Sequence, residues 1–267
     1  MGYIIWRCGH FVICRGFYFT SYDESLVNPD LKQPSTATGL ILASLVIGGW
    51  AAIHIYSVFF HALSAPVWQT ASLIALQCWL YAGMFIVAHD TMHGSLTPRH
   101  PKVNAIIGKA IMFVYAGFDW TYMRDAHHAH HDNPGTQDDP DFNADNPTAF
   151  WPWYYKFFTQ YFGLRQIFIL IGFTLSYVFI FGANYLNTII MWAVPAILSS
   201  VQLFYFGTYL THRHAEDFPD HHNARTNEFP RWLSLLTCFH FGYHHEHHLF
   251  PSEPWWRLPA RKFESKS

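Results

Sequence analysis

Charged side chains are scarce in this 267-residue chain. Lys, Arg, Asp and Glu together make up 13% of the residues, about half of the roughly 25% that is usual in soluble domains. The formal net charge is −2 with histidine neutral. A composition this apolar excludes a disordered protein and a charged coiled coil, and the lack of excess positive charge argues against a nucleic-acid partner.

Cysteine is also scarce, and its four copies are scattered. Cys8, Cys14, Cys78 and Cys238 form no Cys-x-x-Cys pair, so we expect neither a disulfide framework nor a thiolate metal site. The chain has no Gly-x-Gly-x-x-Gly or other nucleotide-binding motif. Any redox chemistry would therefore take its electrons from a partner protein.

Four long windows contain no charged residue at all. Each has 21–23 residues, close to the roughly 20 that cross about 30 Å of hydrocarbon as a helix. The windows are 38–60, 67–88, 166–186 and 188–210. They predict an all-α integral membrane protein with about four transmembrane helices in two hairpins, and a soluble helical bundle is the alternative. The shorter stretch 103–118 carries Lys109, so we expect it to be re-entrant or interfacial.

The distribution of Lys and Arg predicts the orientation. The expected hairpin turns are 61–66 and the single residue Asn187, and neither contains a basic residue. All 16 basic residues then lie on the opposite face, which the positive-inside rule makes cytoplasmic. Residues 38–267 are predicted to form one membrane domain. Residues 1–37, rich in loop signals and without a signal-peptide pattern, are predicted to form a cytoplasmic or interfacial arm.

Histidine is unusually abundant, with 19 copies against 16 Lys and Arg together. Sixteen of them fall between 89 and 248, on the predicted cytoplasmic face. Three clusters have helical spacing, because residues i, i+3 and i+4 share one helix face. The clusters are His89 and His93; His127, His130 and His131; and His244, His247 and His248.

These eight aligned imidazoles, with His212 as a possible ninth, exceed what one metal can bind. Two metals that take four or five ligands each would keep a position open for a small molecule. Imidazole binds Zn, Cu, Fe and Ni. An all-nitrogen pair with open positions fits iron that handles O₂ better than a closed structural zinc site. The sequence therefore predicts a cap of histidine boxes that holds two metals.

The remaining histidines and the nearby carboxylates have other expected roles. His128 and His245 point off the shared helix faces, and His54 is expected to form a hydrogen bond within its own helix. His214, His221 and His222 lie in a charged loop where solvation is the default. Asp90 and the carboxylates of the run 138–141 could ligate a metal directly, but metal-bound histidines usually donate their second N–H to a carboxylate, which is the role we favour. The candidates for that role are Asp90, Asp139 and Glu246; a solvated turn is the alternative for the run 138–141.

Motifs around the histidines resemble a known family. The box set is similar to the membrane fatty-acid desaturase and hydroxylase superfamily. The segments 135–142 (Gly-Thr-Gln-Asp-Asp-Pro-Asp-Phe), 202–208 before His212-Arg213, 239–248 and 251–259 more narrowly resemble the bacterial β-carotene ketolases. The resemblance covers roughly residues 80–260. It carries the family's ligand positions onto the nine histidines named above.

The resemblance implies an enzyme with two non-haem iron ions that oxidises C4 of a β-ionone ring to a ketone. It implies two O₂-dependent hydroxylations, a ferredoxin-type electron donor, a carotenoid taken from the bilayer, and contact with membrane lipid. It also implies a bacterial inner or thylakoid-type membrane with the site on the cytoplasmic face. Aromatic side chains near the boxes could line the ring pocket or form an interfacial belt. The candidates are Phe118, Trp120, Phe206, Phe241 and Trp255.

Other functions remain open at this point. A β-ring 3-hydroxylase or a fatty-acid desaturase would use the same boxes, which cannot separate the three. A membrane metallopeptidase would explain the His-Asp-x-x-His cluster but would leave the other two boxes unused. A bis-histidine haem protein would need single histidines inside facing helices, unlike these clusters.

Overall fold

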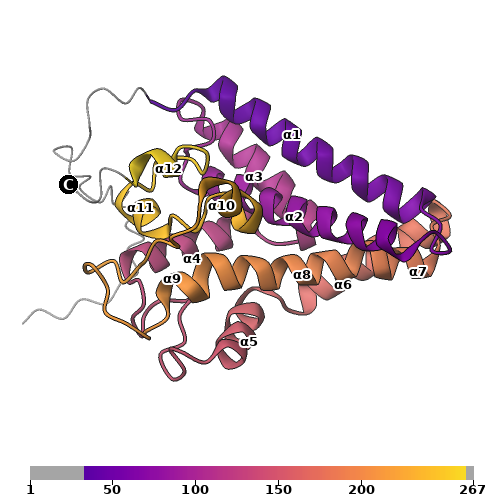
Figure 1. Cartoon of the computed structure of the whole chain (residues 1–267). Helices are drawn as coiled ribbons and strands as arrows, with labels where there is room; N and C mark the ends of the chain where they lie inside the picture. The colour runs from indigo at the N-terminus through magenta and orange to yellow at the C-terminus, as the bar shows by residue number, and fades with distance from the viewer. Residues whose placement is uncertain (1–32, 263–267) are drawn as a thin grey trace, which may run out of the picture. The chain divides into compact units, whose positions relative to one another are not determined.

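Residues 33–262 are described by the computed structural model, and their regular structure is helical (Figure 1). Within this part the β-type pairing is limited to one isolated bridge, between Thr226 and Tyr243. The prediction of an all-α chain is therefore confirmed. The predicted arm 1–37 lies almost wholly outside the described residues and stays a prediction, as does the domain boundary drawn after it.

The elements follow one another along the described chain, and three of its long helices contain four π-helical segments, labelled η. The helices are α1 (Thr36–Ile55), η2 (Tyr56–Phe60), α2 (Val67–Met92), α3 (Pro101–Ala116), α4 (Trp120–Asp132), α5 (Phe150–Tyr161), α6 (Leu164–Leu175), η3 (Ser176–Ile180), α7 (Tyr185–Thr188), η4 (Ile189–Ala193), α8 (Val194–Leu203), η5 (Phe204–Tyr209), α9 (Leu210–His212), α10 (Arg231–Cys238), α11 (His244–Leu249) and α12 (Leu258–Arg261).

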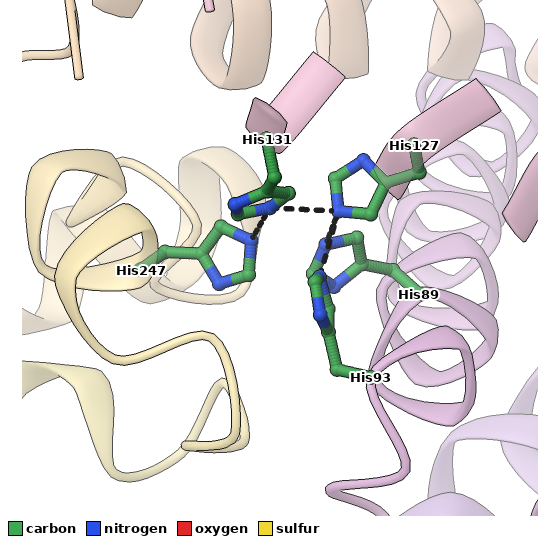
Figure 2. Close-up of side chains that lie close together, drawn as sticks. All are labelled: His89, His93, His127, His131 and His247. Carbon is green, nitrogen blue, oxygen red and sulfur yellow. Dashed lines mark hydrogen bonds between the residues drawn. The ribbon is translucent and has the colours of Figure 1, made fainter. Parts of the chain in front are cut away.

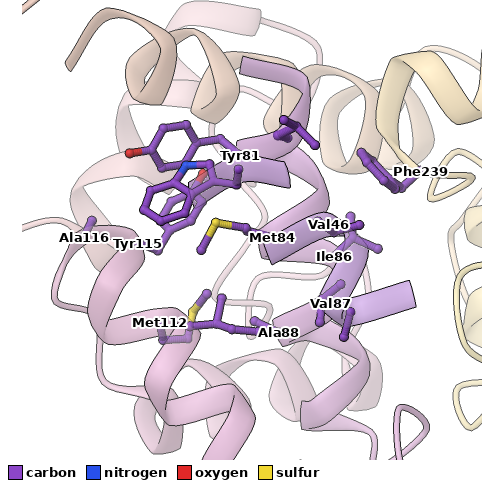
Figure 3. Close-up of a cluster of buried hydrophobic side chains, with 14 of the residues drawn as sticks. Val46, Tyr81, Met84, Ile86, Val87, Ala88, Met112, Tyr115, Ala116 and Phe239 are labelled. Carbon is purple, nitrogen blue, oxygen red and sulfur yellow. The ribbon is translucent and has the colours of Figure 1, made fainter. Parts of the chain in front are cut away.

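Helix α2 is the centre of the bundle and packs against α1, α3 and α8. Its second half is buried on every side, which suits a helix that is apolar all round. Figure 3 shows this core, in which Met84 of α2 lies near Tyr115 of α3 and Ile86 of α2 lies near Val46 of α1. The packing fixes the end of α2, where the first histidine box is located.

A glycine allows α3 to approach this core closely. A Cβ atom on Gly108 would lie 2.1 Å from Trp120 Nε1 and 2.3 Å from Thr91 Oγ1. The indole Nε1–H of Trp120 donates a hydrogen bond to that Thr91 hydroxyl at 2.8 Å. Gly108 thus makes room for a contact that joins α3, α4 and the end of α2.

The second turn differs from the prediction. Asn187 was expected to be the turn, but it lies inside α7, and the chain reverses at residues 181–184. Gly182 adopts a positive φ of 71° there, and the Asn184 side chain accepts hydrogen bonds from the backbone N–H groups of Leu186 and Asn187. The uncharged windows alone did not reveal this turn, because Gly182 and Asn184 are as uncharged as the helices beside them.

Asn187 instead links the two turns. Its side-chain amide donates to the backbone carbonyl of His61 at 2.7 Å and lies 3.3 Å from the carbonyl of Ser57. Those carbonyls belong to the end of η2 and the start of the 61–66 turn. The bonds satisfy backbone groups that a helix end leaves without partners.

His54 also connects elements, which corrects a second prediction. Its Nε2 pairs with the hydroxyl of Tyr177 in η3 at 3.2 Å, rather than with a group of its own helix. The ring stacks on Trp50 at 4.9 Å and meets the edge of Trp192. His54 is therefore a buried packing residue between α1, η3 and η4.

Among residues 33–262, three helical segments are long and apolar enough to cross a membrane: Thr36–Phe60, Val67–Met92 and Tyr185–His212. A fourth candidate is the pair Phe150–Tyr161 and Leu164–Ile180, which is bent by 74°. The predicted window 166–186 is thus shorter as a helix than expected. The stretch 103–118 forms the single continuous helix α3, which packs along α2 and is not among these candidates.

The short helices α4, α9, α10, α11 and α12 gather at one end of the bundle, on the left of Figure 1. Helix α9 continues directly from η5, whose π-helical turns shift the direction of the residues that follow. Gly207 in η5 leaves space for the ring of Phe241, since a Cβ there would lie 2.9 Å from it. This end of the bundle carries all three histidine boxes.

Candidate metal centre

The first box comes from the end of α2. His89 lies in the last turn and His93 is the C-cap residue, so the two rings leave the same side of the helix. Both rings approach the ring of His127, with Nε2–Nε2 distances of 2.8 Å from each. Two boxes distant in sequence therefore meet at one point.

The second box lies on α4, which begins at a well-formed cap. The Asp119 side chain accepts hydrogen bonds from the backbone N–H groups of Thr121 and Tyr122. Such a cap fixes where the helix starts, and with it the direction of every later side chain. His127 and His131 project to one side, with 3.1 Å between their Nε2 atoms. His130 projects to the other.

The third box lies on α11, and His212 follows η5 in α9. The Nε2 atom of His247 lies 2.9 Å from that of His131, whereas His248 and His244 approach each other at 3.2 Å. The ring of His212 meets the ring of His244 at 4.7 Å between centroids. The third box is therefore divided between two neighbourhoods, like the second.

The nine predicted ligands form two groups. Within each group, the nitrogen atoms that could bind a metal all lie within 4.8 Å of one another. Figure 2 shows the larger group, with rings from α2, α4 and α11 turned toward a common centre. The groups are His89, His93, His127, His131 and His247, and His130, His212, His244 and His248. The structure thus brings every predicted ligand into one of two groups, of five and of four.

Hydrogen bonds on the far side of two rings favour a metal-binding form. His130 Nδ1 pairs with Asp139 Oδ2 at 2.9 Å, and His212 Nδ1 pairs with the carbonyl of Asn223 at 2.7 Å. A ring that donates from Nδ1 keeps its lone pair on Nε2. The Nε2 atom of His212 is buried and has no hydrogen-bond partner among the described residues. The donor set therefore fits a metal ion.

Electrostatics keep most of these rings neutral. Burial, and then the neighbouring histidines, lower the pKa of His127 and His131 well below the usual value. Burial alone would also lower the pKa of His130, but the charge of Asp139 and the hydrogen bond to it raise that pKa instead. Neutral imidazole is the form that coordinates a metal, so little proton loss opposes binding.

The three carboxylates proposed to orient the rings have different surroundings. Asp139 contacts His130 as predicted. Asp90 Oδ1 lies 3.6 Å from His89 Nδ1, beyond hydrogen-bond distance, and Asp90 Oδ2 accepts instead from the backbone N–H of Trp255 at 3.1 Å. Glu246 accepts a hydrogen bond from the Thr226 hydroxyl. Asp90 therefore fastens the C-terminal segment to the end of α2.

Both histidine groups border one small cavity of about 50 Å³. A space of this size holds one or two water molecules, so a larger ligand would have to displace flexible side chains such as Met92 and Met123. The cavity is lined by Phe85, His89, Met92, Met123, His127, His130, Asp141, Phe157, Tyr161, Gly207, Thr208, Phe241 and His244. Most of its exposed surface is apolar, and four of its lining residues are predicted metal ligands.

Comparison with known proteins agrees with this arrangement. The fatty acid desaturase family model matches residues 65–173 and 160–264. A β-carotene ketolase of Paracoccus sp. strain N81106 is 45% identical over 234 residues, which cover 86% of this chain and 95% of the relative. The chain belongs to the β-carotene ketolase family, within the fatty acid desaturase superfamily.

Other members of the family are similar over most of this chain. A β-carotene ketolase of Paracoccus sp. strain PC1 is 43% identical, covering 85% of this chain and 93% of the relative. A zeaxanthin 4-ketolase of Chlamydomonas reinhardtii is 34% identical, covering 83% of this chain and 52% of that longer protein. The resemblance inferred from the motifs is thereby confirmed.

Of the five aromatic residues proposed for the ring pocket of this ketolase-family chain, only Phe241 lines the cavity. Trp120 is buried against Gly108 and Thr91, and Trp255 packs on Phe239 at 5.3 Å. Phe118 stacks on Tyr115 at 6.1 Å between centroids. Phe206 lines an outer apolar groove between α2, α8 and α10. The structure therefore places the other four outside this cavity, and their assignment to the ring pocket stays a prediction.

Two further polar residues line the cavity: Asp141, which the sequence offered only as part of the run 138–141, and Tyr161, which sequence reasoning missed. The Tyr161 hydroxyl donates a hydrogen bond to Asp141 Oδ1. Burial raises the pKa of the Asp141 carboxyl above its usual range. The structure does not make the run 138–141 a uniformly solvated turn, because Asp138 is exposed, Asp139 is buried, and Asp141 is partly buried. A solvated turn would expose all three.

The histidines outside the two groups bond elsewhere. His128 Nε2 lies 3.3 Å from the carbonyl of Met92. His245 Nε2 and His222 Nδ1 both contact Asp220, at 2.8 and 3.0 Å. Asp220, His221 and His222 form a third, more exposed group of donors in the 213–230 loop. His214 and His221 are exposed, as expected for solvated histidines, whereas His222 is partly buried beside Asp220.

Proposed function

We propose that this protein is a β-carotene 4-ketolase, which oxidises C4 of β-ionone rings to a ketone and so makes echinenone and canthaxanthin. The observation that carries the proposal is that two histidine groups border one apolar cavity in a chain 45% identical to a β-carotene ketolase. Zeaxanthin, with hydroxylated rings, is a further substrate that would yield astaxanthin. The zeaxanthin 4-ketolase among the relatives supports this.

The reaction balances as two hydroxylations and one dehydration. Each hydroxylation consumes one O₂, two electrons and two protons, inserts one oxygen atom into a C4–H bond, and releases one water. The second produces a geminal diol. The diol loses water, since one C–O bond breaks and the other carbon–oxygen bond becomes a carbonyl.

Two non-haem iron ions are the metals that we propose for the two histidine groups. Imidazole alone does not select iron over zinc or copper. The oxidation of a C–H bond by O₂ at this site needs a redox-active metal, which argues against zinc, and the membership of the fatty acid desaturase superfamily favours iron over copper. When bound, the metal pair would supply the oxidant for the C4–H bond. The chain's residues would hold the ions, keep His130 oriented through Asp139, and enclose the ring with apolar side chains.

A partner protein would supply the electrons, and we propose a ferredoxin-type donor. The chain contains no nucleotide-binding motif that would let it accept a hydride directly. The carotenoid would arrive from the bilayer, because both the substrate and the bundle surface are apolar. Exposed apolar residues such as Ile41, Leu45 and Phe179 support lipid contact.

We further propose four transmembrane segments in two hairpins, with the histidine groups on the cytoplasmic face of a bacterial inner or thylakoid-type membrane. Two observations support this topology. The 61–66 turn and the 181–184 turn contain no basic residue, and the Asn187 bonds to Ser57 and His61 hold them at the same end of the bundle. The basic residues then belong to the opposite face.

The test is pigment analysis of bacterial cells that make β-carotene and express this chain. Chromatography with mass spectrometry should show products in which one or both ring CH₂ groups have become C=O. Products that gain whole oxygen atoms without losing hydrogen would indicate a ring 3-hydroxylase instead. Unchanged carotenoids in membranes that contain the iron-loaded protein would contradict the proposal and leave a fatty-acid desaturase as the candidate.

A further inference from the structure

The cavity between the histidine groups contains one carboxylate that is not a predicted metal ligand. Asp141 lines this space with Phe85, Phe157 and Phe241. A hydrocarbon ring gives a carboxylate nothing to bind, and burying a charge among apolar groups is costly. Asp141 therefore requires an explanation other than recognition of an unmodified β-ionone ring.

Asp141 is held rigidly but keeps one oxygen free. Its backbone N–H donates to Asp139 Oδ1 at 2.8 Å, and its carbonyl accepts from the Trp153 indole at 2.7 Å. Tyr161 donates to Oδ1 of its carboxylate. Within residues 33–262 no donor contacts Oδ2. The carboxylate is thus fixed in direction, with one acceptor atom available to a ligand in the cavity.

We propose that Asp141, oriented by Tyr161, binds the C4 hydroxyl of the half-oxidised ring and holds it for the second oxidation. The proposal rests on the ketolase function proposed above. Its substrate class is a 4-hydroxy-β-ionone ring, the product of the first oxidation. A free hydroxyl in an apolar cavity lacks the hydrogen bond that it had in water, and Asp141 Oδ2 supplies an acceptor.

The same contact orients the one hydrogen that remains on C4 for the second oxidation. With its hydroxyl bound by Asp141, the C4 carbon can present its remaining hydrogen toward the histidine rings that share the cavity, among them His89, His130 and His244. After the second hydroxylation, Asp141 can accept the proton of one hydroxyl while the other leaves C4. The departing hydroxide takes a proton back, so one water is released and the carboxylate is unchanged.

The test compares products formed from β-carotene by the wild type, Asp141→Leu and Tyr161→Phe. We expect Asp141→Leu to shift the products from ketone to 4-hydroxy carotenoid, with the ketone-to-alcohol ratio lowered about tenfold or more, as for the loss of a hydrogen bond to a charged group. Tyr161→Phe should shift the ratio in the same direction but less. A residue needed only for folding would lower both products together.

Two matched controls belong to the same segments. Asp138→Asn removes an exposed carboxylate three residues away, and Tyr155→Phe removes an exposed hydroxyl from the same helix α5 as Tyr161. Both should leave the ratio unchanged. Protein and iron content of the membranes, measured for each variant, separates loss of folded enzyme from a change in product.

A second experiment supplies a 4-hydroxy carotenoid directly. The wild type should convert it to the ketone, and Asp141→Leu should do so with a raised apparent KM. An unchanged ratio in folded Asp141→Leu would overturn the role of Asp141, even if the wild type makes ketone. If Asp141→Leu lost ketone formation only with zeaxanthin as the substrate, this would also overturn the role, because Asp141 would then bind the C3 hydroxyl of zeaxanthin. A wild type without any ketone product would instead contradict the proposed function.

Discussion

His130 differs from the other histidines of the two groups because, among the described residues, it alone forms a hydrogen bond with a carboxylate. Asp139 accepts from His130 Nδ1 and also from the backbone N–H groups of Gly135 and Asp141. These bonds hold Asp139 ionised, so its pKa lies below the usual value despite burial. The direction of the His130 ring is therefore set before any metal binds.

Replacing Asp139 by Asn should weaken metal binding at the group of four histidines. The amide keeps the size of the side chain but removes the charge that orients His130, and such partners are typically worth about 10–100-fold in metal affinity. Metal titration of purified protein would measure the change. The control is Asp138→Asn, which alters an exposed neighbour. Equal affinities in the two variants would contradict the role of Asp139.

Replacing His247 or His130 by Ala should abolish ketolase activity and lower the bound iron. Each substitution removes one donor, from the group of five and from the group of four respectively. Elemental analysis of the purified protein measures iron beside the activity. His128→Ala is the control, since that ring belongs to neither group: it lies 3.3 Å from the Met92 carbonyl and stacks on the ring of His93. Full activity in either ligand variant would refute the assignment.

At the scale of elements, close helix packing depends on small residues. Gly108 on α3 faces the Trp120 indole, whereas Gly172 on α6 has no atom within 4 Å of an added Cβ. The two glycines lie in helices of similar composition but in different surroundings. Alanine substitutions at the two positions therefore separate the effect of close packing on stability from the effect of intrinsic helix preference.

Gly108→Ala should lower the stability of the protein in detergent, and Gly172→Ala should not. The added methyl group at 108 must displace Trp120 or Thr91, and such overpacking typically costs about 1–3 kcal/mol. At 172 alanine should be neutral or slightly stabilising, because it is the better helix former. Thermal unfolding followed by circular dichroism measures both. Equal midpoints would show that α3 can shift without cost.

The positions of the helices were partly predictable from the sequence. Uncharged windows predicted the positions of α1, α2 and the Tyr185–His212 segment well, because membrane-spanning length and composition are local properties. They failed at Asn187, where an uncharged turn lies between two uncharged helices. They also could not indicate that His54 pairs with Tyr177, since that contact joins residues 123 positions apart.

At the scale of the whole molecule, the topology can be tested by cysteine labelling. Single cysteines at Ser64, in the first turn, and at Ala144, between α4 and α5, would be introduced into a chain whose native cysteines are replaced. Both positions are exposed. A membrane-impermeant maleimide should label position 64 in intact cells and position 144 only after lysis. The reverse labelling pattern would place the histidine groups on the outer face of the membrane and contradict the proposed topology.

The sequence by itself determined the helical character of the chain, the residues of the three histidine boxes, and the family. These follow from spacing and composition, which act within a few helical turns. Motif likeness also identified all nine histidines that the structure gathers. The prediction of two sets of four or five ligands followed from counting alone.

Only the tertiary structure decided which histidine belongs to which group. Position i+3 falls about 60° short of a full helical turn from position i and i+4 about 40° past it, so rings of one box diverge to opposite sides. His131 therefore faces His247, and His130 faces His212 and His248. The same long-range packing also places Phe241 at the cavity, Trp120 and Trp255 in the core, and Asp141 next to Tyr161. No local pattern specifies such contacts, because they depend on how separate helices pack.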